Sequence, residues 1–137
     1  MTIQVTKLVL TNTRVTLGST DITDCVAAVT LNSTAAEVET TSFGGSAVTR
    51  VGGLQDNSVT LSIMNDFSYV EGVVYPLVGS TAQINIRANG TTLGTANPGY
   101  TATVLVTEWS PVNGAVGELN TADVTWPISG TITKATS

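Results

Sequence analysis

Apolar residues alternate with hydroxyl-bearing ones along most of the chain, with the period of two that indicates half-buried β-strands. This pattern predicts strands over residues 26–31, 36–43, 57–64, 81–88 and 100–109, and a final pair over 121–136 broken at Pro127. In two of them, Glu37, Glu39 and Thr41 fall on one side, as do Ser58, Thr60 and Ser62. We therefore expect 36–43 and 57–64 to pair as an antiparallel hairpin with one apolar face and one acidic or hydroxylic face.

One segment departs from this alternation. In DFSYVEGVVYPLVG, Phe67, Val70, Val74 and Leu77 recur at close to helical spacing, and Asp66 precedes them as a candidate N-cap. Gly72 weakens a helix, and Pro76 disfavours helical backbone at the residue before it. The segment predicts one short helix of about two to three turns, packed on a sheet through those four apolar residues.

A glycine-bearing loop is expected between the two strands of the hairpin. It spans Gly44 to Asp56 and includes Gly45, Gly52, Gly53 and a single cation, Arg50. The Asn89-Gly90 pair predicts a tight turn after the strand at 81–88, since both residues tolerate positive φ. Together these elements predict a mainly β protein, a sandwich or barrel with one short helix.

Composition limits the chemistry available to this fold. The chain has 137 residues, which corresponds to one domain over 1–137, and 42% of them are hydrophobic. It has no histidine and one cysteine, Cys25, so neither an intrachain disulfide nor a Cys–His nucleophile can form. Five scattered bases against ten acids do not form the cationic cluster that binds nucleic acid. No apolar run is long enough for a membrane helix, and no secretory signal is visible, so we expect synthesis in the cytoplasm.

Two patterns superficially suggest a reaction site. Glu37 and Glu39 lie roughly 6.5 to 7 Å apart along a strand, a separation that a glycosidase pair uses. No aromatic or arginine cluster accompanies them, so solvated acids on a polar face are the preferred interpretation. The glycine loop lacks the Gly-Lys-Ser/Thr ending of a phosphate loop, and a strand follows it instead of a helix. We therefore expect no enzyme activity, no cofactor and no metal site.

The order of segments resembles the major tail tube proteins of long-tailed, non-contractile bacteriophages. The resemblance is carried by residues 26–67 with their glycine loop, by YVEGVVYPLVG, by NPGYTATVLVTEWSPVNGAVGEL, and by ADVTWPISGTIT. It implies a β-sandwich flanked by a helix, assembled as hexameric rings that stack into a tube. In such a tube each subunit gives four strands to a continuous inner barrel, and the loop at 44–56 reaches the adjacent ring.

The resemblance also implies a function and partners. The protein would be a structural virion protein, assembled in the host cytoplasm into the tail tube that delivers the genome. Its partners would be its own copies and the tape-measure, tail terminator and tail-tip proteins, while double-stranded DNA would pass through without specific binding. With six copies of four strands, the barrel measures roughly 48 Å across between backbones.

Particular residues receive roles under this hypothesis. Glu37, Glu39, Thr41, Ser58, Thr60 and Ser62 would face the lumen, where an acidic, hydroxylated wall denies DNA a place to attach. Arg50 would meet an acid of the next ring, Asp56 or Glu118. The alternative from another class is an immunoglobulin-like β-sandwich binding module of a phage or bacterial surface protein, which would need aromatic and polar side chains on a concave face.

Overall fold

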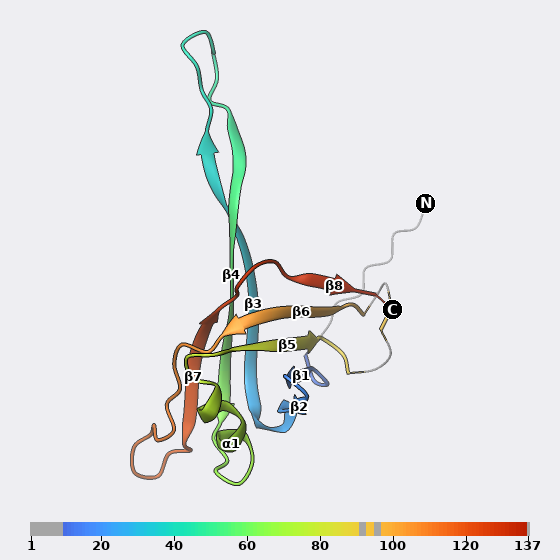
Figure 1. The fold of residues 1–137 in the computed structure, drawn as a ribbon, viewed down its shortest axis with the longest axis vertical. Helices are drawn as coiled ribbons and strands as arrows, with labels where there is room; N and C mark the ends of the chain where they lie inside the picture. Colours follow the sequence, from blue (N-terminus) through green and yellow to red (C-terminus); the bar gives the residue numbers. More distant parts are fainter. Residues whose placement is uncertain (1–9, 91–92, 95–96, 137) are drawn as a thin grey trace.

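Two antiparallel β-sheets face each other across one apolar core (Figure 1). The structure, a computed structural model, describes residues 10–90, 93–94 and 97–136. The five-stranded sheet has the order β2 (Thr20–Asp21), β1 (Arg14–Leu17), β5 (Thr81–Arg87), β6 (Gly99–Leu105), β8 (Thr133–Ala135). The three-stranded sheet has the order β3 (Val26–Glu39), β4 (Arg50–Met64), β7 (Thr121–Pro127). The predicted mainly β fold with one short helix is confirmed, and no closed barrel forms within the described part of the chain.

The core consists of alternate residues from both sheets. On β4, Val59, Leu61 and Ile63 are buried while Ser58, Thr60 and Ser62 point away, as the alternation predicts. The same rhythm buries Ile84 and Ile86 on β5, and Ala122, Val124 and Trp126 on β7. Trp126 is fully buried, and its indole Nε1 donates a 2.9 Å hydrogen bond to the carbonyl oxygen of Glu108. Each sheet therefore has one face in the core and one face outside it.

The predicted helix is shorter than expected. α1 covers only Val70–Val74 and passes into a 3-10 turn over Tyr75–Leu77, because Pro76 lacks the N–H that would continue the α-helix. Val70 and Val74 are buried and Leu77 packs against the core, but Phe67 is exposed, so its predicted packing role is wrong. Asp66 does not cap the helix. Its carboxylate instead accepts hydrogen bonds from the backbone N–H and the hydroxyl of Ser68, which lies two positions before the first residue of α1, Val70.

The hairpin differs from the prediction in three respects. The run at 26–31 and the first part of the run at 36–43 form one continuous strand, β3, because β4 pairs with it from Val26 to Glu39; residues 40–43 lie beyond its end. The predicted loop at 44–56 is too long at its second end, since β4 already begins at Arg50. Residues 57–64 therefore pair with 26–33, not with 36–43, and Ser58 lies opposite Asn32. The sequence pattern identified strand-forming residues but not which of them are neighbours.

The C-terminal half shows smaller differences. β5 and β6 pair as an antiparallel couple, but their connection runs from Ala88 to Pro98 and is longer than the tight turn predicted at Asn89-Gly90. The strand predicted over 100–109 ends at Leu105. The final pair does break near Pro127, and its two halves join different sheets. No helix among the described residues has the length and hydrophobicity needed to span a bilayer.

Candidate functional site

The far half of the β3–β4 hairpin stands clear of the body of the molecule (Figure 1). Every residue from 32 to 56 is exposed, and burial begins again at Asn57. We call residues 34–56 the arm. Its paired part, from Thr34 to Glu39, spans roughly 17 Å at about 3.4 Å per residue. A two-stranded ribbon without a sheet or helix behind it is only marginally stable in water, so the arm is the part of the β3–β4 hairpin with the least support from its own chain among the described residues.

The base of the arm is fixed by a buried polar residue. Asn57 is only 1% exposed, and its side-chain oxygen accepts a 2.8 Å hydrogen bond from the Ser33 hydroxyl. Its side-chain nitrogen donates to the carbonyl of Gly130 at 3.1 Å, and its own carbonyl accepts from the Ile128 backbone at 2.9 Å. These bonds join β3, β4 and the segment after β7 at the point where the hairpin leaves the core. The pattern analysis treated Asn57 only as a strand start and missed this role.

The arm has one charged face and one apolar face. Across the ribbon, Glu39 is opposite Arg50 and Val38 is opposite Val51. Arg50 forms an ion pair with Glu37 on the charged face, so the predicted contact between Arg50 and the next ring is not required to satisfy the cation. On the apolar face Val38 is 46%, Val51 53% and the nearby Leu54 88% exposed. Apolar area of this kind, bare on a narrow projection, is typical of a protein–protein contact surface.

The alternation of β3 places the acids on a different side from the one expected. Between Ala35 and Glu37 the β4 strand carries one extra residue, which leaves the alternation of β3 uninterrupted. Glu37 and Glu39 therefore lie on the side of β3 that carries Val29 and Leu31, not on the side of Thr30. The predicted common face with Ser58, Thr60 and Ser62 is wrong, and the acids lie farther out along the ribbon.

The end of the arm is a hydrogen-bonded turn. The backbone N–H of Thr40 donates to the carbonyl of Thr49 at 2.8 Å, and the hydroxyl of Thr41 accepts from the Thr49 backbone at 3.0 Å. Gly45 donates to Ser42 at 3.0 Å, while Phe43 is fully exposed. Of the predicted loop residues, only Gly44 and Gly45 lie in this turn. Arg50, Gly52, Gly53 and Asp56 belong to β4, because the strand pairing extends that far.

The outer face of the three-stranded sheet is rich in hydroxyls. Ser58, Thr60 and Ser62 lie on it as predicted, and the hydroxyls of Thr60 and Thr125 are 3.2 Å apart in a hydrogen bond. Their cross-strand neighbours are Asn32, Thr30, Ala28, Pro127, Thr125 and Asp123. Asp123 is the single charged residue of this set, so the face combines one acid with hydroxyls and no cation.

A fourth chain segment lies along the free edge of β7. The Thr125 backbone N–H donates to a carboxylate oxygen of Glu108 at 2.9 Å, and the Thr121 N–H donates to the Asn113 carbonyl at 3.3 Å. These contacts run in opposite chain directions, so residues 108–113 are antiparallel to β7. The Glu108 side chain takes the position that a backbone carbonyl would hold in a ladder, which explains why no regular strand is formed there.

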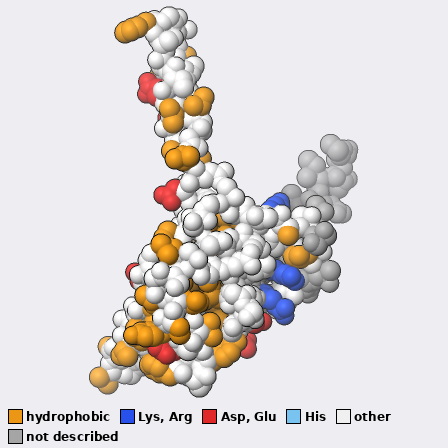
Figure 2. Space-filling model, in the orientation of Figure 1, with side chains coloured by type: hydrophobic (Ala, Val, Ile, Leu, Met, Phe, Trp, Pro, Cys, Tyr) orange, Lys and Arg blue, Asp and Glu red, His pale blue; other side chains and the backbone are white. Residues whose placement is uncertain are grey.

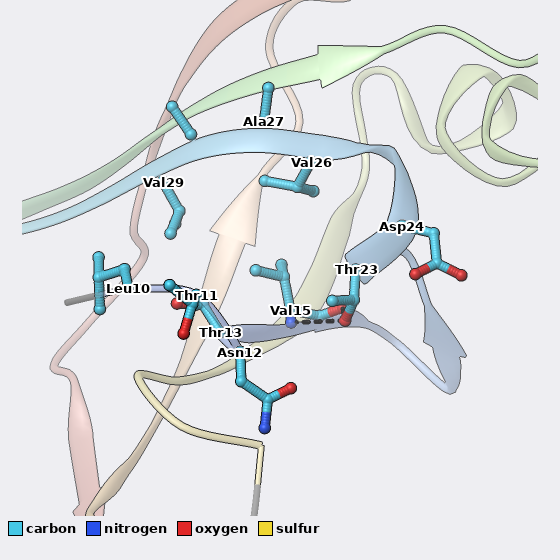
Figure 3. A pocket seen from close by; sticks show the side chains of 11 residues that line it. Leu10, Thr11, Asn12, Thr13, Val15, Thr23, Asp24, Val26, Ala27 and Val29 are labelled. Carbon is cyan, nitrogen blue, oxygen red and sulfur yellow. Dashed lines mark hydrogen bonds between the residues drawn. The ribbon is translucent and has the colours of Figure 1, made fainter.

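Two cavities open beside the start of β3. The first, of about 350 Å³, is lined by residues 10–13 before β1 and by the first residues of β3 (Figure 3). Beside it, the Val15 backbone N–H donates a 3.0 Å hydrogen bond to the Thr23 hydroxyl. Asp24 is the single carboxylate of its lining, and there is no base beside it. The second cavity, of about 530 Å³, separates β3 from the end of the five-stranded sheet. We call it the cleft; its walls are mainly Val29, Leu31, Ile86, Tyr100 and Ile132, with Lys134 beside them.

Charge is distributed unevenly over the molecule. Arg14 and Arg87 are cross-strand neighbours, and Lys134 lies opposite Tyr100 in the adjoining row, so these cations gather at one end of the five-stranded sheet. Figure 2 shows them on one side of the body, while acidic side chains mark the arm. A further group of exposed apolar residues lies on α1, its flanks and the loop before β7: Phe67, Tyr69, Tyr75, Val112, Val116 and Leu119.

Residues with altered protonation do not form a reaction centre. Burial raises the pKa of the Cys25 thiol, which is typical of a structural cysteine and not of a nucleophile. Hydrogen bonds from the Thr23 hydroxyl and backbone lower the pKa of Asp21, and those from Ser68 lower the pKa of Asp66. Among the described residues no group of three or more cysteines and acids lies together as metal ligands would.

Comparison with known proteins adds no relative. No protein-family model matches the sequence, and a search of curated proteins finds no match. A function for this chain must therefore be inferred from its own residues and geometry.

Proposed function

We propose that this protein is a self-assembling structural subunit whose hexameric rings stack into the tail tube of a long-tailed, non-contractile bacteriophage. The observation that carries the proposal is the arm: a projecting ribbon whose apolar side chains are bare and are covered by no other part of the chain that the structure describes. A heterologous contact, in which the arm of one copy binds a different surface of the next, generates rings or filaments. This accords with the resemblance of the sequence to tail tube proteins.

The order of chain segments in the smaller sheet also suits a ring. β3, β4, β7 and residues 108–113 lie side by side and alternate in direction, so the two outermost segments are antiparallel to each other. In a ring of identical copies, residues 108–113 of one subunit would pair with β3 of the next without any change of pattern. Four segments per subunit is the number that the resemblance implies for the inner barrel.

The hydroxyl-rich face of this sheet would then line the channel. The wall would bind water through the hydroxyls of Ser58, Thr60, Ser62 and Thr125. Asp123 would add one negative charge from each copy. Duplex DNA binds proteins chiefly through phosphates neutralised by lysine and arginine, and this face has none. DNA would pass along such a wall without specific binding. Glu37 and Glu39 would act in contacts between copies, not in the lumen.

Electron microscopy of the purified full-length protein tests the proposal. Negative-stain images at increasing protein concentration should contain rings or hollow filaments with a six-fold projection. Light scattering on the same samples should show mass increasing with concentration. A strictly monomeric species at high concentration would overturn the proposal and favour a binding module.

A further inference from the structure

We propose that the cleft is the docking site for the arm of a second copy of this chain. The inference rests on the proposed self-assembly and names the surface that receives the arm. The cleft is concave and mainly apolar, with walls from Leu31 on one sheet and Ile86 and Tyr100 on the other. The arm is a narrow convex ribbon whose apolar face is bare. Each surface has the shape and polarity that the other lacks within its own chain.

The size of the cleft fits such an occupant. Its volume of about 530 Å³ is within the range of roughly 300 to 1,000 Å³ over which proteins enclose ligands. Val38 and Val51 lie directly opposite each other on the arm and so form one knob of two valine side chains. A few aliphatic groups of this kind would fill the cleft and remove both surfaces from water.

Charge supports the same pairing. The Glu39 side chain makes no ion pair or hydrogen bond among the described residues, and it lies on the charged face of the arm, which would be turned toward the mouth of the cleft when the Val38–Val51 face enters it. Lys134, at the mouth of the cleft, also has no such partner there. Arg14 and Arg87 lie at the same end of the five-stranded sheet, but Arg14 forms an ion pair with Asp21 at 3.9 Å, so Lys134 is the cation on which the charge argument rests. An acidic arm therefore enters a basic, apolar cleft, and Glu39 of one copy meets Lys134 of the next.

The other exposed apolar surface fits the arm less well. The group around Val112, Val116 and Leu119 contains Glu118 in the same loop, and Asp66 follows Asn65, which is hydrogen-bonded to that loop through Pro111 and Asn120. Glu39 would meet like charge there, which costs binding energy at an interface. The cleft is thus the surface that combines apolar area, concavity and opposite charge.

Cross-linking between two singly substituted proteins tests this assignment. Ala88 also lines the cleft. Val51→Cys and Ala88→Cys proteins are mixed, allowed to co-assemble, oxidised and examined by mass spectrometry for a peptide joining positions 51 and 88. The matched control replaces Ala88→Cys with Val116→Cys. Native Cys25 is buried and does not compete. We expect the 51–88 link to dominate. Filaments that give a 51–116 link, or no 51–88 link, would overturn the docking site while leaving the tube proposal intact.

A charge exchange provides an independent measurement. Glu39→Lys and Lys134→Glu should each raise the critical concentration for assembly by at least about tenfold, because each places like charges together. The double variant should assemble again at a concentration near that of the wild type. A double variant no better than the two single ones would contradict the contact. If the unsubstituted protein never assembles, both proposals fail together.

Discussion

Asn57 lies at the boundary between the core and the arm, and at the residue scale it is the most consequential polar group in the structure. It is the one buried polar residue among those described, and each end of its side chain has a partner. A buried amide is tolerated only when its hydrogen bonds are made. Asn57 therefore provides hydrogen bonds at the end of the sandwich where β3 and β4 leave the core. These bonds fix the direction in which the hairpin departs.

Replacing this residue should weaken the whole fold. Asn57→Ala removes both side-chain bonds and leaves the Gly130 carbonyl unpaired, so the free energy of unfolding should fall by about 1–3 kcal/mol. Urea denaturation followed by tryptophan fluorescence measures this loss. The matched control is Asn32→Ala on the neighbouring strand, where the side chain is exposed, and its effect should stay within about 0.5 kcal/mol. Equal effects of the two substitutions would contradict the anchoring role of Asn57.

Asp66 provides a prediction about protonation. The Ser68 hydroxyl, 2.6 Å from the carboxylate, is the main cause of its lowered pKa, and the Ser68 backbone N–H adds to it. Because the pKa is lower in the folded state, ionised Asp66 favours folding above its unfolded pKa. That contribution is lost as the pH falls through the folded pKa. Ser68→Ala should raise the pKa of Asp66 part of the way to its ordinary value, since the backbone bond remains. Carboxyl chemical shifts in an NMR titration would show this, and an unchanged pKa would contradict it.

At the scale of elements, the arm illustrates what strand pairing requires of a backbone. Gly53 lies at the irregularity in β4, where a Cβ would approach Val38 Cγ2 to 3.1 Å and Ala36 Cβ to 3.2 Å. At Gly52, one residue away, a Cβ would meet nothing within 4 Å. The sequence pattern assigned both glycines to a loop. In the structure, close packing across the ribbon explains Gly53 but not Gly52.

This difference predicts contrasting variants. Gly53→Ala should loosen the arm by about 1 kcal/mol because Val38 and Ala36 must move, whereas Gly52→Ala should be neutral. Amide hydrogen exchange read at Val38 and Val51 measures the effect locally. The exchange of core amides on β5 should be the same in both variants. Faster exchange in Gly52→Ala than in Gly53→Ala would contradict the packing explanation.

The elements also show how far sequence patterns extend. Period-two alternation identified the strands β4 and β5 and the buried side of each, because both have one exposed face and one buried face, and the strand composition of 121–136 also located β7. It did not predict the strand pairing of the arm, because both faces of the arm are exposed and alternation indicates only which side of a strand is buried. It also failed on pairing, since 36–43 and 26–31 match 57–64 about equally well as patterns. Arg50 and Asp56 were assigned to a loop because their glycine neighbours are more common there than in strands. The cleft joins residues far apart in the sequence, so no local signal could reveal it.

At the scale of the whole molecule, the buried core that folds the sandwich is separate from the arm that we propose for assembly. The buried residues all lie outside 32–56, so the sandwich does not depend on the arm for its core. Exposed apolar residues, in contrast, concentrate on the arm and near α1. This division means that each process can be removed without the other.

Shortening the arm tests that division. Replacing residues 36–54 by a two-residue Asn-Gly turn should leave a folded protein, since Ala35 and Gln55 are cross-strand partners and this connection suits antiparallel strands. Its thermal midpoint, measured by circular dichroism below the assembly concentration, should stay close to that of the full chain. Its mass by light scattering should remain that of one subunit at every concentration. A shortened protein that still forms filaments would show that the arm is not the assembly element.

The independence of the arm from the core has an evolutionary consequence. Substitutions between residues 34 and 56 escape the selection that folding imposes on Leu61 or Trp126, so this stretch is free to diverge quickly. Under the proposed assembly, the fit of the arm to a neighbouring copy would restrain it instead, and a change there could be answered by a change in the receiving surface. Related proteins could thus become mutually incompatible while keeping the same sandwich, which would prevent mixed polymers when two of them occur in one cell.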